Sequence, residues 1–121
     1  MIGILFAAAL GATNPAVTQA DIAQTICVKG WTATIRPTRR EAWSLKRNLL
    51  QGRKAKGLIL DHVVPLEVGG APRDLANLQL QTRAAATRKD RIENRIHREV
   101  CAGTMTLQSG QATFLGDHSW P

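Results

Sequence analysis

Apolar residues in the last third of the chain recur with the spacing of a helix. Ile92, Ile96 and Val100 lie four residues apart, and Gly103 follows them. Side chains three to four residues apart share one face of a helix, and glycine commonly ends one, so this pattern predicts a helix from about Thr82 to residue 102. The segment SGQATFLGDHSW after it predicts a short final helix.

A second helical pattern occupies the segment RREAWSLKRNLLQG, and Gly52 stands where that helix would stop. Its apolar residues fall roughly on one side of the predicted helix; they are Trp43, Leu45, Leu49 and Leu50. Because aromatic residues make up only 4% of the chain, we interpret its tryptophans as core residues. These are Trp31, Trp43 and Trp120.

Two other segments are rich in β-branched residues and lack helical spacing. TICVKGWTATIRPT predicts an extended segment that ends near Pro37. LILDHVVPLEV predicts two short strands around a bend at Pro65, and GGAPRD predicts a loop. Asp74 is placed to cap a single helical turn that ends near Asn77. Together these elements predict a small α+β domain with flanking helices.

The charge of the chain narrows the classes of partner. Its 121 residues suffice for one small domain, and 16 Lys and Arg residues stand against 9 Asp and Glu residues. The net charge of +7 favours nucleic acid first and an anionic membrane surface second, with an unspecific basic surface as the alternative. The basic side chains that we assign to phosphate contacts are Arg53, Lys54, Lys56, Arg88 and Lys89.

The first 20 residues contain no charged side chain. Their apolar run has about the length of a signal-peptide core and is too short to span a bilayer, and small residues follow it up to Ala20. We therefore expect residues 1–20 to be a signal peptide and residues 21–121 to be an exported domain, periplasmic or secreted. The alternative is a disordered apolar tail.

The chain has two cysteines, Cys27 and Cys101. In an exported protein, an even number of cysteines predicts a disulfide. This one would close a loop of roughly 75 residues and stabilise the domain by about 4 kcal/mol. Two buried free thiols are the alternative if the leader is not real.

Asp61 and His62 form the pair that suggests chemistry. Hydrolysis of a phosphodiester needs an activated water and positive charge at the phosphate. A neutral imidazole can take a proton from water, and a carboxylate can bind a hard divalent cation. Neighbours on a strand point to opposite faces, so both side chains can serve one site only where the strand ends or twists, as Pro65 allows.

This stretch resembles the HNH endonucleases of the ββα-metal superfamily, in which a two-stranded hairpin and a helix hold one divalent metal ion. The matching residues follow the family's order: Asp61-His62, Pro65-Leu66-Glu67, Gly69-Gly70 and Asn77-Leu78, and then a helix. Together with TICVKGWTATIRP and KDRIENRIHREVCAG, they are similar to a group of small exported HNH-like proteins over most of residues 21–121.

The resemblance implies a metal-dependent endonuclease with little sequence specificity, acting on nucleic acid and on double-stranded DNA first. It implies His62 as general base, Asp61 as metal ligand and Asn77 as the residue that fixes the loop and positions the histidine. The implied cofactor is one divalent metal ion, which is magnesium, manganese, nickel or zinc.

The chain departs from the family at the third metal-ligand position, where it has Ala86. Asp90, one helical turn further on, could supply the missing ligand, and so could Glu67 on the predicted return strand. Otherwise the site is degenerate, and the protein is a nucleic-acid-binding module or an interaction protein of the cell envelope. We favour retained activity because the base and the first ligand are present.

Overall fold

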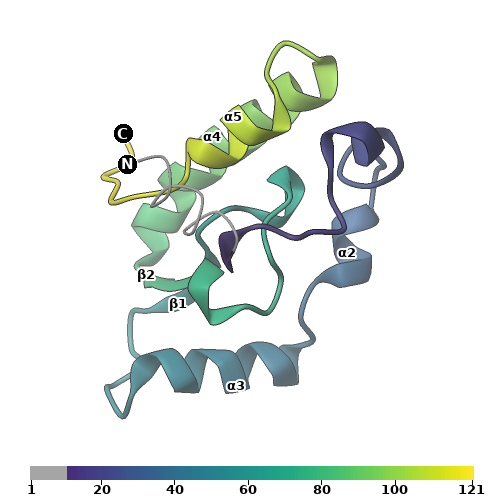
Figure 1. The fold of residues 1–121 in the computed structure, drawn as a ribbon. Coiled ribbons are helices and arrows are strands. Elements are labelled where there is room, and N and C mark those ends of the chain that lie inside the picture. The colour runs from purple at the N-terminus through teal and green to yellow at the C-terminus, as the bar shows by residue number, and fades with distance from the viewer. Residues whose placement is uncertain (1–10) are drawn as a thin grey trace.

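The computed structural model describes residues 11–121, which form a mixed α+β domain (Figure 1). The α+β class predicted from the sequence is therefore confirmed. Its elements in chain order, with η for a 3-10 helix, are η1 (Gln19–Gln24), α2 (Trp31–Ile35), α3 (Arg39–Leu50), β1 (Ile59–His62), η2 (Leu66–Val68), η3 (Leu75–Asn77), β2 (Leu78–Gln81), α4 (Arg83–Ala102) and α5 (Leu107–Ala112).

Strands β1 and β2 form an antiparallel pair, and α4 begins almost directly after β2. Ile59 lies opposite Gln81, and His62 lies opposite Leu78. The connection between the strands, residues 63–77, contains η2 and η3 and brings the chain back alongside β1. The centre of the domain is thus a strand, a compact loop, a second strand and a long helix.

The two longer helices begin at residues suited to that position, and α4 also ends at one. The Thr38 side chain accepts a hydrogen bond from the Glu41 amide at 3.1 Å, and the Glu41 carboxylate accepts one from the Thr38 amide at 3.0 Å. Thr82 caps α4 by accepting from the Ala85 amide at 3.2 Å. The helix ends at Gly103, whose φ of 80° favours glycine. The long helix predicted from the sequence is confirmed.

The core lies where α4 and α5, which run side by side in Figure 1, pack against the loop that follows β1. Ile96 and Val100 of α4 belong to one buried cluster with Val64 and Val68 of that loop. Gly110 permits the close approach of α5, because a Cβ atom there would lie 2.8 Å from a methyl carbon of Val100. This packing fixes the loop against the long helix.

The segment that precedes η1 also packs into the core. Ala12 and Val17 are buried in the same cluster, and the backbone N–H of Asn14 donates to the carbonyl of Gly69 at 2.8 Å. The first ten residues of the predicted signal peptide lie outside the described part of the chain, and cleavage after Ala20 stays a prediction. Such a cleavage would remove these contacts. Among the described helices, none is both long and apolar enough to cross a membrane.

Cys27 and Cys101 form a disulfide, as predicted, with their Cα atoms 5.7 Å apart. It joins the turn before α2 to the last turn of α4, across a sequence separation of 74 residues. Both strands and the loop between them lie inside this covalent ring. The residues of the candidate site are therefore enclosed by it along the chain.

The prediction of an extended segment from residue 25 to residue 38 is wrong. Trp31–Ile35 forms the short helix α2, which begins after Gly30 in the left-handed conformation with a φ of 84°. The β-branched residues of this segment gave a strand signal, but strand propensity is weak beside tertiary packing. Trp31 packs against the core cluster, and the neighbouring Cys27 is tied to α4.

Two further predictions differ from the structure. The return strand is not at residues 66–68, which form η2, but at β2, so Glu67 lies in a helical turn of the loop. Trp43 is not a core residue, because 52% of its surface is exposed on α3. The predicted turn after Asp74 is confirmed, since its carboxylate accepts a hydrogen bond from the Ala76 amide at 2.9 Å.

Candidate active site

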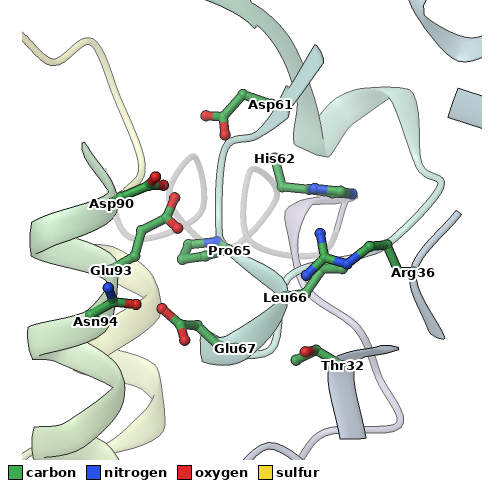
Figure 2. Close-up of a pocket in the computed structure, with 10 residues that line it drawn as sticks. All are labelled: Thr32, Arg36, Asp61, His62, Pro65, Leu66, Glu67, Asp90, Glu93 and Asn94. Atoms are coloured by element: carbon green, nitrogen blue, oxygen red, sulfur yellow. The ribbon is translucent and has the colours of Figure 1, made fainter. Parts of the chain in front are cut away.

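A cleft of about 350 Å³ lies between the end of β1, the loop after it, α2 and α4 (Figure 2). Asp61 and His62 line it together, as a shared site requires. Neighbouring strand residues ordinarily point to opposite faces, but β1 ends at His62. The other lining residues are Thr32, Arg36, Pro65, Leu66, Glu67, Asp90, Glu93 and Asn94.

The imidazole of His62 is held in one orientation by the backbone. Its Nε2 lies 2.9 Å from the carbonyl oxygen of Pro72. A carbonyl only accepts, so Nε2 carries the proton that it donates, and the neutral ring keeps its unprotonated lone pair on Nδ1. Burial lowers the pKa of His62 from its ordinary value of 6.5, since desolvation outweighs the opposing effect of the Pro72 hydrogen bond and Asp61.

The loop that presents the Pro72 carbonyl is anchored to α3. Arg73, the next residue, places its Nε 2.6 Å from one carboxylate oxygen of Glu41 and its second terminal nitrogen 3.1 Å from the other. The hydrogen bond from Arg73, followed by that from the Thr38 amide, lowers the pKa of Glu41 to about 2. Arg73 also donates to the carbonyl of Ile35 at 3.2 Å, which ties the loop to α2.

Asn77 holds the loop from inside. Its side chain is fully buried, and its Oδ1 accepts from the Val64 amide at 2.8 Å. Its Nδ2 donates to the carbonyls of Val64 at 3.0 Å and Ala71 at 2.9 Å. Gly70 makes room for this arrangement, because a Cβ there would lie only 1.8 Å from the Val64 oxygen. The geometry matches the loop-fixing role that the resemblance implies for Asn77.

Lys89, which was assigned to phosphate contacts from the sequence, lies instead beside Asp61. Only 1% of its side chain is exposed, and its Nζ lies 3.0 Å from Asp61 Oδ2 and 2.6 Å from Glu93 Oε2. The same ammonium donates to the carbonyl oxygen of His62 at 2.6 Å. The signal was present in the sequence, because Lys89 lies three residues after Ala86 and four before Glu93 on one helix face.

The carboxylates of the cleft do not form the expected metal site. Among the described residues, no three His, Cys, Asp or Glu side chains converge as ligands. Asp61 is paired with Lys89 and also accepts from Gln79 Nε2 at 3.1 Å. Asp90 and Glu67 line the same cleft, but they complete no such group. The residues present therefore do not fit a divalent metal at Asp61 in this arrangement.

Two of the cleft's carboxyl groups are partly withdrawn from water. Burial raises the pKa of Glu67 and of Glu93 above their ordinary values, although His97 opposes the first shift and Lys89 the second. The Nε2 of His97 lies 2.9 Å from the carbonyl oxygen of Ile26.

Arg36 is a second residue that the sequence did not reveal as part of the site, because its segment was taken as extended. It follows α2, is exposed, and lines the cleft beside His62 (Figure 2). Its positive charge contributes to the lowered pKa of His62. A guanidinium in this position is suited to a phosphate, which it can bind with two hydrogen bonds.

The predicted phosphate-contact residues separate into two groups. Arg53, Lys54 and Lys56 are exposed in the connection after α3. Arg88 is exposed on α4 and donates through Nε to the carbonyl of Trp120 at 3.0 Å. The assignment of Lys89 to phosphate binding is contradicted, because its ammonium is buried among Asp61, Glu93 and the His62 carbonyl.

The exposed face of α3 adds an aromatic residue to the basic surface. Trp43 lines a shallow groove together with Arg47 and Arg53. Arg53 is held at the groove because its guanidinium donates to the carbonyls of Leu49 at 3.0 Å and Leu50 at 2.9 Å. An exposed indole beside fixed guanidinium groups is the combination on which nucleic-acid bases stack.

No protein-family model matches the chain, and neither does any curated protein or solved structure. The likeness to the HNH endonucleases therefore rests on the sequence motifs alone.

Proposed function

We propose that this protein is an HNH-like domain of the ββα-metal type that hydrolyses phosphodiester bonds of nucleic acid. The observation that carries the proposal is the pairing of His62 Nε2 with the Pro72 carbonyl, 2.9 Å apart. It leaves Nδ1 of a neutral imidazole available in a cleft that also holds Asp61 and Arg36. The strand–loop–strand–helix order and the loop-fixing Asn77 agree with this class.

In this proposal, Nδ1 of His62 takes a proton from the water that attacks phosphorus. The bond from phosphorus to one ester oxygen breaks, and that leaving oxygen takes a proton from solvent. The lowered pKa of His62 keeps the ring neutral, and therefore basic, at neutral pH. Arg36 binds the phosphate beside it and offsets the charge that develops on its oxygens. The carbonyl of Pro72 stabilises the imidazolium that forms, because Nε2–H already points to it. No step is assigned to a metal ion.

The bound polymer would extend from the cleft over the basic surface. The net charge of +7 and the exposed Arg53, Lys54 and Lys56 favour phosphate contacts that do not depend on sequence. Double-stranded DNA remains the first expected substrate. Export to the periplasm or the medium is part of the proposal, and the disulfide agrees with an oxidising compartment.

A second candidate is a nucleic-acid-binding module without hydrolysis, and the charge balance of the cleft favours it. Asp61, Glu67, Asp90 and Glu93 face this cleft together, which disfavours a phosphate. Lys89 offsets the charge of only two of these carboxylates. In this case the polyanion would bind the α3 surface and stay uncut.

A nuclease assay separates the candidates. Supercoiled plasmid, linear duplex and single-stranded RNA are incubated with the protein in EDTA, and then with magnesium, manganese, nickel or zinc. The first proposal expects cleavage that His62→Ala abolishes and that His118→Ala, an exposed histidine outside the cleft, leaves intact. Binding without cleavage under every condition would favour the second candidate.

A further inference from the structure

The ammonium of Lys89 lies among protein oxygens. It donates hydrogen bonds to the Glu93 carboxylate and to the backbone carbonyl of His62, both at 2.6 Å. It also forms an ion pair with Asp61 Oδ2 at 3.0 Å. A lysine side chain that is 1% exposed is rare, and these two hydrogen bonds and the opposite charges hold its ammonium here.

The negative charges of the Asp61 and Glu93 carboxylates are offset by the Lys89 ammonium. The side chains of Asp61 and Glu93 are only 16% and 14% exposed, so water screens their negative charges poorly. Both belong to the cleft, and Lys89 lies between them. On the other side, the ammonium lies 5.4 Å from the centre of the Phe114 ring, which favours a cation at this position.

We infer that the Lys89 ammonium, which is paired with Asp61 and Glu93 of the cleft, takes the place of a divalent metal ion at Asp61. A metal bound to Asp61 would have to share that carboxylate with an ammonium 3.0 Å away, and like charges repel strongly where solvent is excluded. Ala86, at the expected third ligand position, offers no donor atom in exchange. The cleft of the wild-type protein therefore excludes the ion, and removal of Lys89 creates a site for it.

This inference does not require that the protein cleaves nucleic acid. Metal binding is measured on the protein alone. A failed nuclease assay therefore does not contradict the inference about Lys89, and an active nuclease does not establish it. The full chain is titrated with manganese and followed by electron paramagnetic resonance of the free ion and by thermal unfolding. The variants are Asp61→Asn, Lys89→Gln and the double variant Lys89→Gln/Asp61→Asn.

We expect the wild-type protein and Asp61→Asn to bind manganese equally weakly, with no shift in Tm. Lys89→Gln should bind one ion at least about tenfold more tightly and gain Tm as manganese is added, because a ligand of the native state stabilises it. The Asp61→Asn change in that background should abolish both effects.

Two results would overturn the inference. One is a manganese ion that binds the wild-type protein and is lost in Asp61→Asn. The other is a folded Lys89→Gln that gains no affinity for manganese. If Lys89→Gln does not fold even with manganese present, the wild-type protein and Asp61→Asn are compared alone. Equally weak manganese binding then supports the inference, and binding that Asp61→Asn removes overturns it.

Discussion

The side chain of Asn77 pairs with both backbone groups of Val64. Its Oδ1 accepts from the Val64 amide at 2.8 Å, and its Nδ2 donates to the Val64 carbonyl at 3.0 Å. Val64 lies two residues after His62, so this pair of hydrogen bonds fixes the chain where it leaves β1. The orientation of the proposed base depends on that fixed exit.

Asn77→Ala should be among the most damaging single substitutions. It leaves the Val64 amide and the carbonyls of Val64 and Ala71 without these partners in a fully buried place. An unsatisfied buried group costs about 1–3 kcal/mol, so we expect the free energy of unfolding to fall by at least about 3 kcal/mol. Urea denaturation measures it, with Asn48→Ala on the exposed face of α3 as the control. An equal loss in both variants would contradict the role of Asn77.

The lowered pKa of His62 predicts the pH dependence of activity. If His62 is the base, the rate should fall on the acid side with a midpoint below 6.5, since protonation of the ring removes its lone pair. His62→Ala should lower the rate at neutral pH by at least about a hundredfold. A pH–rate profile checks both statements, and an acid midpoint above 6.5 would exclude the buried ring of His62 as the group that titrates.

The same shift predicts a pH dependence of stability. In the unfolded chain, His62 binds a proton below a pH of about 6.5. In the folded chain its pKa is lower, so it binds the proton only at a lower pH. The contribution of His62 to stability is therefore complete above that pH and is lost as the pH falls toward the lower native pKa. Urea unfolding of the wild-type protein and His62→Gln between pH 4 and pH 8 checks this, and parallel curves would contradict it.

Binding to duplex DNA should weaken steeply with salt. Each phosphate contact contributes about 0.9 to the slope of log Kd against log salt concentration. Replacing Arg53, Lys54 and Lys56 together by glutamine should lower that slope by up to about 3 if each contacts a phosphate. Fluorescence anisotropy from 50 to 200 mM salt measures it. Lys29→Gln, an exposed change before α2, is the matched control, and a slope that the triple variant leaves unchanged would place the binding surface elsewhere.

The disulfide should account for a large part of the stability. Closing a ring across 74 residues stabilises a native state by about 4 kcal/mol on the chain-entropy model. A reducing agent should lower the unfolding free energy of the wild-type protein by about that amount and leave Cys27→Ser/Cys101→Ser unaffected. Mass spectrometry of exported protein should identify the linked peptides, and two free thiols there would contradict both the bond and the compartment.

The segment before η1 gives a test of where the exported chain begins. Val17 is 5% exposed in the core, so Val17→Ala should cost about 2 kcal/mol in a chain that keeps this segment. Val28→Ala, at a position that is 45% exposed, should cost less than about 0.5 kcal/mol. If export removes everything up to Ala20, Val17→Ala has no effect on the exported protein, and its intact mass shows the cut.

The sequence predicted the elements whose signals are local. The long helix α4 has regular apolar spacing between Thr82 and Gly103, and Asp74 caps its single turn as expected. The short helix α2 escaped prediction, because one turn of β-branched residues carries no helical period and its conformation depends on packing of Trp31. The return strand was misplaced because two short segments that alternate apolar and polar residues, 66–68 and 78–81, could each pair with β1.

The sequence indicated the strand residues of the candidate site and Asp90 of α4, but it did not reveal the positions of Lys89 and Arg36. Asp61, His62 and Asn77 could be found because they lie in one short stretch with a recognisable order. Lysine is almost always exposed, so its residue type favours a surface charge at Lys89, although its spacing from Ala86 and Glu93 places it on their helix face. Arg36 reaches the cleft because it directly follows the short helix α2, which no local pattern indicates.

The ring closed by Cys27 and Cys101 also determines how the domain responds to proteolysis. Arg36, His62 and Lys89 all lie between the two cysteines along the chain. A protease that cuts one bond in the exposed connection around Lys54 therefore yields two polypeptides that remain a single covalent molecule. The two parts of the cleft stay at high effective concentration and can reassociate without a search through solution. The fragments separate on a gel only after reduction.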